Sequence, residues 1–246
     1  MAKSYRTEVL AIIAILLYSI TMNQGELFYE FDEHEKNELY APQDLNELYE
    51  LSVDAYYAAL YARMSCLPVN QEVARFIDKV KNAALRFANS RTGTERNAAK
   101  RAATDRSDGD VIAVLNAARK VWHEIHRLTG LLRFSLEQNG RYTARCAPDH
   151  FILPALAEHF TLRFGKTPWA IIDEKRGLCL SREDGGPARL SEWSLVTASE
   201  ETQKDIWEDL WRLYHRSINN EARKNPDLQR QFMPERYHKY LTEMSV

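Results

Sequence analysis

Four of the chain's seven histidines lie in one stretch of the second half, residues 121–164, together with several arginines. Histidine transfers protons near neutral pH, and a neighbouring carboxylate can orient its ring. Arginine binds phosphate groups through its planar guanidinium. These residue types together suit phosphodiester or base chemistry. The candidates for catalysis are His126, Asp149, His150 and His159.

The candidates for phosphate binding are basic residues in this stretch and in the tail that follows it. They are Arg119, Lys120, His123, Arg127, Arg133, Arg163, Arg176, Arg223 and Arg236. Tyr142, Trp169 and Tyr237 are candidates for stacking on an exposed base. A structural alternative exists for several of these side chains, since Asp149 can cap a helix and Arg163 can be a surface charge.

Several known motifs are incomplete. His123-Glu-Ile-His126 is one residue short of the zinc-protease pattern, although histidines three apart can share one metal if His150 or His159 supplies a third ligand. Gly165-Lys166-Thr167 resembles the end of a phosphate loop, but Phe160 stands where that loop requires glycine. The sequence lacks a glycine-rich dinucleotide fingerprint and a three-cysteine cluster motif. We therefore expect neither a metal nor a cofactor.

Composition restricts the class of partner. The net charge of −2 gives no overall basic field, so nucleic acid must be bound by a local patch. The three cysteines are an odd number without a CxxC pair, which favours a reducing compartment, the cytoplasm. The apolar run at residues 9–20 is too short to span a bilayer, so we expect no membrane partner. Whether this run is core, anchor or a non-native extension stays open.

Apolar spacing predicts the elements that position these residues. Helices are expected over residues 45–67, 71–89, 111–128 and 151–164, and after a capping box at Thr197 and Glu200. Two hairpins are expected, residues 131–137 with 141–147 and residues 169–172 with 178–181. The expected fold class is α+β. Residues 1–110 form a mainly helical region that ends in a basic linker at 90–110. In residues 111–246, a small antiparallel sheet of two hairpins packs with helices.

The helix expected at 111–128 has an apolar stripe on one side and basic residues on the other, interrupted only by Glu124. Gly130 is expected to cap it. In the last long helix, Ile206, Trp207, Leu210, Trp211, Tyr214 and Ile218 are expected to line a buried side.

The second half also resembles a family of domains of unknown function that is assigned to DNA metabolism or DNA repair. The matching residues are His126-Arg127-Leu128 with Gly130, Leu132-Arg133-Phe134, Pro148-Asp149-His150, Leu153-Pro154, His159-Phe160, Arg163-Phe164, Trp169, Asp173, Arg176, Gly177, Trp211, Tyr214, Asn219, Arg223, Met233-Pro234 and Arg236-Tyr237. They keep the family's order over about residues 108–241. The sequence departs from the family pattern at Leu128, Asn220 and His238, and its first hundred residues match poorly.

In some bacteria the family's domain is fused to a uracil-DNA glycosylase-like domain, and in others it is a stand-alone partner of a radical-SAM protein. The resemblance therefore implies a DNA repair or DNA modification accessory. Together with the basic His/Arg face, it predicts a protein that binds nucleic acid, with DNA as the expected partner. Glycosylase activity is not carried over, because the chain lacks glycosylase motifs. Two alternatives stay open: a nucleic-acid-processing enzyme whose four catalytic candidates converge in one pocket, and an adaptor that docks a repair enzyme through residues 219–246. The oligomeric state is not predicted.

Overall fold

The computed structural model describes residues 45–87, 94–193 and 206–244. The chain divides into two compact units, residues 1–35 and 36–246, and all described residues belong to the second. The apolar run at 9–20 and the capping box at Thr197 and Glu200 lie outside the described residues.

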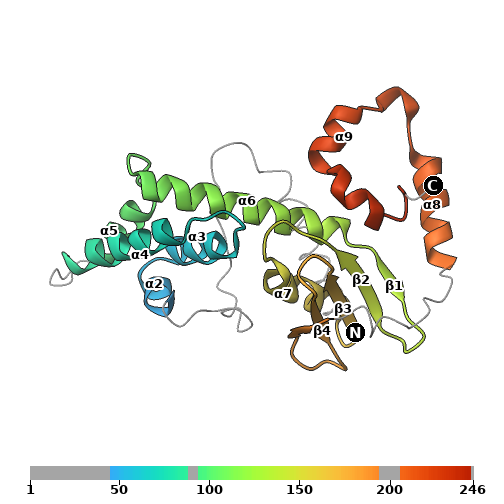
Figure 1. The fold of residues 1–246 in the computed structure, drawn as a ribbon, viewed down its shortest axis with the longest axis horizontal. Helices are drawn as coiled ribbons and strands as arrows, with labels where there is room; N and C mark the ends of the chain where they lie inside the picture. Colours follow the sequence, from blue (N-terminus) through green and yellow to red (C-terminus); the bar gives the residue numbers. More distant parts are fainter. Residues whose placement is uncertain (1–44, 88–93, 194–205, 245–246) are drawn as a thin grey trace, which may run out of the picture. The chain divides into compact units, whose positions relative to one another are not determined.

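Five helices come first in the described chain. They are α2 (Asn46–Leu51), α3 (Val53–Met64), α4 (Asn70–Leu85), α5 (Thr94–Ala103) and α6 (Gly109–Leu131). α3, α4 and α6 contact one another, as Figure 1 shows. The single helix predicted at 45–67 is wrong, because Ser52 is extended and its side chain accepts a hydrogen bond from the Ala55 N–H, which starts a new helix.

The linker predicted at 90–110 is also wrong in part, since α5 lies within it. The segment has almost no large apolar residue, but Ala98, Ala99 and Ala103 are buried. Alanine has the highest helix propensity and lets helices approach closely. α5 can therefore pack against α4 through small side chains alone.

Helix α6 runs between the helical part and the sheet. Asp108 caps it by accepting hydrogen bonds from the N–H groups of Asp110 and Val111, at 2.9 and 3.1 Å. Most of its predicted apolar stripe is buried, and α7 (Leu153–Phe164) contacts the helix as well. The buried stripe residues are Val111, Val114, Ala118, Val121 and Leu128, and the half-buried ones are Leu115, Trp122 and Ile125. The helix extends past the predicted end, so Gly130 lies inside its last turn and Leu132 is the first extended residue.

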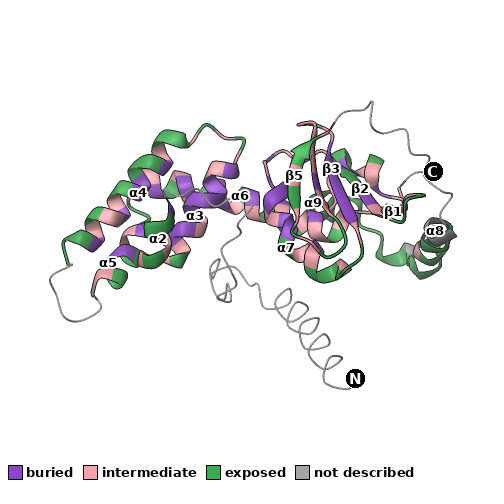
Figure 2. Cartoon of the chain, turned by 90° about the horizontal axis from the view of Figure 1, so that it is seen from below, coloured by how far each residue is buried: buried purple, intermediate pink, exposed green. Residues whose placement is uncertain are grey.

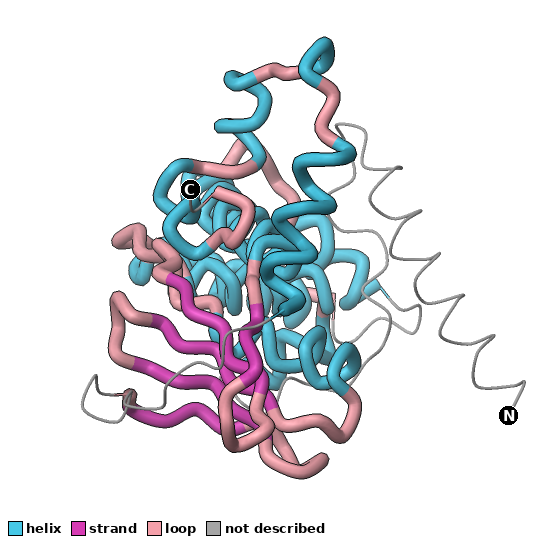
Figure 3. The backbone as a smooth tube through the Cα atoms, turned by 90° about the vertical axis from the view of Figure 1, so that its right-hand side faces the viewer, coloured by secondary structure: helices cyan, strands magenta, loops and turns pink. Residues whose placement is uncertain are grey.

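The sheet has five strands in the order β1-β2-β3-β4-β5. They are β1 (Phe134–Leu136), β2 (Tyr142–Cys146), β3 (Trp169–Asp173), β4 (Leu178–Arg182) and β5 (Arg189–Glu192), which lie side by side in Figure 3. Both predicted hairpins form. The α+β class is confirmed, but the sheet is mixed and not antiparallel, because α7 returns the chain so that β2 and β3 pair in parallel.

Strand β5 was not predicted. Leu190 is its only large apolar residue, and the strand pairs with β4 alone at the sheet edge. In this edge strand only Leu190 is half-buried and the other three residues are exposed, so the strand lacks the alternating apolar pattern that identifies strands in a sequence.

The C-terminal part consists of α8 (Ile206–Ile218), η4 (Glu221–Arg223), α9 (Pro226–Phe232) and η5 (Glu235–Tyr240). The predicted burial of the apolar side of α8 is wrong for Leu210, Trp211, Tyr214 and Ile218, which are all exposed (Figure 2). Tyr237 and Leu241 are buried and attach the tail to the rest of the unit. Among the described helices, none is long and apolar enough to cross a membrane.

Candidate functional site: a basic groove beside helix α6

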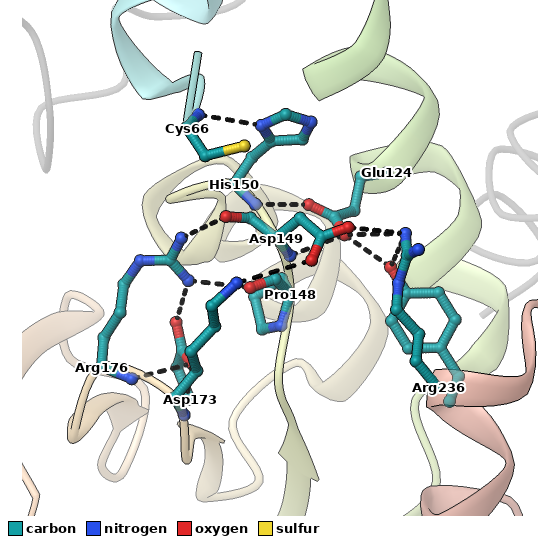
Figure 4. A network of polar contacts seen from close by, with 10 residues as sticks. Cys66, Glu124, Pro148, Asp149, His150, Asp173, Arg176 and Arg236 are labelled. Atoms are coloured by element: carbon teal, nitrogen blue, oxygen red, sulfur yellow. Dashed lines mark hydrogen bonds and ion pairs between the residues drawn. The ribbon is translucent and has the colours of Figure 1, made fainter. Parts of the chain in front are cut away.

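The centre of the site is the chain segment Pro148–His150, which connects β2 to α7. Glu124 of α6 holds it, and this side chain is only 2% exposed. The carboxylate accepts hydrogen bonds from the backbone N–H groups of Asp149 and His150, at 2.9 and 2.8 Å (Figure 4). The Tyr237 hydroxyl donates to the same carboxylate at 2.5 Å. Glu124 therefore joins three parts of the chain that are far apart in sequence.

A second buried acid supports the same segment from β3. Asp173 is fully buried and accepts a hydrogen bond from Arg176 at 2.8 Å. Arg176 also donates to the carbonyl oxygens of Pro148 and Asp149, at 3.0 and 2.6 Å. Arg176 was predicted to bind nucleic acid, but its guanidinium is already used in holding this segment.

His150 has a defined orientation. Its Nδ1 accepts a hydrogen bond from the Cys66 backbone N–H at 3.1 Å, so the neutral ring carries its proton on Nε2. Burial lowers the pKa of His150, against the opposing effect of Glu124 and Asp149. His150 near neutral pH is therefore a hydrogen-bond donor through Nε2.

The segment forms one wall of a hollow of about 690 Å³, which we call the α6–α9 groove. The groove is lined by Lys120, His123, Glu124, His126, Arg127, Leu131, Asp149, His150, Gln231, Phe232 and Arg236. Seven of these were predicted as site residues from the sequence. The structure thus brings together side chains from α6, the β2–α7 connection, α9 and η5.

The charges in the groove are unevenly distributed. Arg236 contacts Asp149 at 3.1 Å and Glu124 at 3.6 Å, so its charge is largely compensated. Neither Lys120 nor Arg127 has a carboxylate at ion-pair distance within the part of the chain that the structure describes. Burial lowers the pKa of His123, and Arg127 and Arg119 lower it further. Among the described residues, the positive charge in the groove that has no ion-pair partner therefore lies along α6.

The remaining predicted residues lie outside the groove. Arg133 pairs with Glu243 at 2.6 Å, and the ring of His159 packs on Phe160 in α7. The Arg119 Nε is buried, whereas Arg163 and Arg223 are exposed elsewhere. Of the four catalytic candidates, His126, Asp149 and His150 converge and His159 does not.

The three aromatic residues expected to stack on a base are engaged in the fold. Trp169 and Tyr237 are fully buried and offer no face to a ligand. Tyr142 packs against Phe164, with ring centroids 5.5 Å apart. Phe232, whose ring does line the groove, was not selected from the sequence, and no spacing or motif marks it.

Glu124 was also missed as a functional residue, although the sequence carries a signal for it. The prediction that Glu124 interrupts the basic side of the helix is wrong, because it lies three residues after Val121 and four before Leu128, within the apolar stripe, and is buried. A buried carboxylate needs hydrogen-bond donors. Its donors here are backbone N–H groups, and a sequence does not show which of these point toward it.

Taken over the described ranges, no group of three or more His, Cys, Asp or Glu side chains is arranged to hold a metal ion. The i, i+3 pair His123 and His126 lines the groove, but neither His150 nor His159 completes a ligand set with it.

The fold and the groove define an α+β protein whose helical region leads into a five-stranded mixed sheet, with a partly basic groove beside α6. Residues 78–243 match the family described as Domain of unknown function (DUF4130), and the chain belongs to that family. The match includes every residue that lines the groove. Comparisons with curated proteins and with solved structures give no match.

Proposed function

We propose that the protein is a nucleic-acid-binding accessory in DNA repair or DNA modification and that the α6–α9 groove is its binding site. The observation that carries the proposal is the convergence of Lys120, His123 and Arg127 from one side of α6 into a single hollow. The resemblance of the second half to a family assigned to DNA metabolism supports DNA as the nucleic acid.

The spacing of these side chains suits a chain of phosphates better than a single anion. Lys120, His123 and Arg127 follow one another at three and four residues, so they lie along one helix face over about 10 Å. Lysine offers a compact charge and arginine a planar fork, and both bind phosphate oxygens.

The geometry of His150 favours binding over general-base catalysis. A general base needs a nitrogen lone pair directed at the substrate, and the Nδ1 lone pair of His150 is occupied by the Cys66 N–H. Its Nε2–H is instead suited to donate to an oxygen or a ring nitrogen of a ligand. On this proposal the chemistry belongs to a partner, a radical-SAM or glycosylase-like repair protein, as the resemblance implies.

The proposal is tested by measuring the binding of a labelled DNA oligonucleotide across a salt series, with the double charge reversal Lys120→Glu/Arg127→Glu. We expect at least about a tenfold loss of affinity and a salt dependence that is weaker by roughly two phosphate contacts. The matched control is Arg101→Glu/Arg106→Glu, which changes the net charge equally at exposed positions outside the groove. Equal losses in both doubles, or binding that does not respond to salt, would refute the proposal.

A further inference from the structure

The α6–α9 groove contains aromatic surface as well as positive charge. Phe232 at the end of α9 lines the groove and is 65% exposed. Single exposed apolar side chains are common on protein surfaces, but this ring stands beside phosphate-binding side chains, where it can contact a ligand. Its neighbour Gln231 also lines the groove and carries both a donor and an acceptor.

A second aromatic ring is presented from α6. His126 lines the groove and stacks on Trp122, with ring centroids 5.3 Å apart and an interplanar angle of 3°. This contact leaves one face of a flat, supported ring for another partner. The groove therefore offers two rings together with the phosphate-binding side chains of α6.

The size of the groove selects the kind of nucleic acid. About 690 Å³ is the size of site that encloses a small molecule or a few nucleotide groups, and it does not accommodate a duplex. In a duplex the faces of the bases are covered by their neighbours, so an aromatic side chain reaches them only when the base is unpaired.

We infer that the groove binds unpaired nucleotides of single-stranded nucleic acid, with a base stacked on Phe232, His126 as a secondary stacking surface, and the backbone phosphates on Lys120 and Arg127. This inference rests on the proposed function and specifies its substrate class. Base–aromatic stacking tolerates every base, because each has a π-face, so the groove is expected to show little sequence preference. The Gln231 amide and the His150 Nε2–H are in position to donate to the edge of a bound base.

The test compares two labelled oligonucleotides of equal length and charge, an oligothymidine and an abasic strand with the same phosphates, together with a duplex. The wild-type chain is expected to bind oligothymidine about tenfold more tightly than the abasic strand. Phe232→Ala should remove most of that difference while the salt dependence stays the same, because no phosphate contact is lost.

The matched control is Leu228→Ala, which truncates another exposed apolar residue of α9, one turn earlier and outside the groove. It should keep the full preference for oligothymidine. The inference is overturned if wild type binds the two strands equally, if it binds the duplex more tightly, or if both α9 variants behave alike. Salt-dependent binding that requires Lys120 and Arg127 but ignores Phe232 would overturn this inference and leave the proposed function standing. Absence of binding to every strand would overturn both.

Discussion

Two histidines from the same stretch of sequence, His150 and His159, have very different surroundings in the fold. His150 follows β2 and lines the groove, and its Nδ1 accepts a backbone hydrogen bond from Cys66. His159 lies in the middle of α7, outside the groove, and its Nε2 is buried without a hydrogen-bond partner among the described residues. Burial lowers the pKa of both rings, and Arg163 lowers that of His159 further. The pKa alone therefore does not distinguish a site residue from a structural one.

The difference teaches that hydrogen-bond partners, not residue type, define the site. Two buried acids organise the segment around His150. Glu124 accepts a hydrogen bond from the His150 backbone N–H. Asp173 accepts one from Arg176 and so orients that guanidinium to donate to the Asp149 carbonyl oxygen. Nothing comparable is found around His159 in the described residues. A buried polar atom without a hydrogen-bond partner lowers the free energy of unfolding. His159 therefore destabilises the fold slightly, whereas the hydrogen bond at His150 satisfies its buried nitrogen.

The largest expected effect comes from breaking the His150 region at its centre. Glu124→Ala leaves the N–H groups of Asp149 and His150 and the Tyr237 hydroxyl without their acceptor. We expect a loss of at least about 3 kcal/mol in the free energy of unfolding, since each unsatisfied buried group costs about 1–3 kcal/mol. Urea unfolding measures this loss.

The control lies beside the other histidine. Glu158→Ala removes an exposed acid next to His159 and should change the free energy of unfolding by no more than about 0.5 kcal/mol. Similar losses for the two variants would mean that Glu124 does not organise the His150 region.

The second prediction concerns His159 and acid. Because burial lowers its pKa in the folded state, the unfolded chain takes up the proton first as the pH falls below about 6.5, and stability is lost in that range. His159→Leu removes both the titrating group and the unpaired nitrogen. We expect this variant to be about 1 kcal/mol more stable than wild type near neutral pH, and to lose less stability on acidification.

Urea unfolding at about pH 7.5 and about pH 5.5 separates these contributions, because the range brackets the ordinary pKa of histidine. An unchanged loss on acidification in His159→Leu would show that other groups, such as His150 and His123, cause the acid sensitivity.

Helices α6 and α8 show how far the sequence could predict the fold. Both have apolar residues three and four positions apart, and this pattern correctly predicts a helix in each case. In α6 most of the stripe is covered by α3, α4 and α7, whereas in α8 the predicted stripe residues Tyr214 and Ile218 are 53% and 58% exposed. Periodicity reports which side of a helix is apolar, and the tertiary neighbours decide whether that side is buried.

The groove could be predicted in part. The basic residues of α6 and the Pro148–His150 segment were found, because charge and proximity in sequence marked them. The roles of Glu124 and Arg176 were not predicted. Both side chains bind backbone N–H or carbonyl groups, which nearly every residue has, so the sequence does not mark the partners. The parallel pairing of β2 with β3 was missed because the sequence indicated two hairpins, and the pairing between them depends on how α7 returns the chain.

The smallest expected effect separates the Asp149 side chain from its backbone. The carboxylate is 41% exposed and pairs with Arg236 at 3.1 Å and Lys175 at 3.5 Å, while its backbone N–H and carbonyl are bound by Glu124 and Arg176. Surface ion pairs contribute about 0–1 kcal/mol and are screened by salt. Asp149→Asn should therefore lower the free energy of unfolding by less than about 1 kcal/mol in low salt and by almost nothing in high salt.

Asp173→Asn changes a fully buried acid and should lower the free energy of unfolding more at both salt concentrations. Urea unfolding in the two salts decides the matter, because equal and salt-independent losses in both variants would mean that the Asp149 carboxylate itself holds the His150 region.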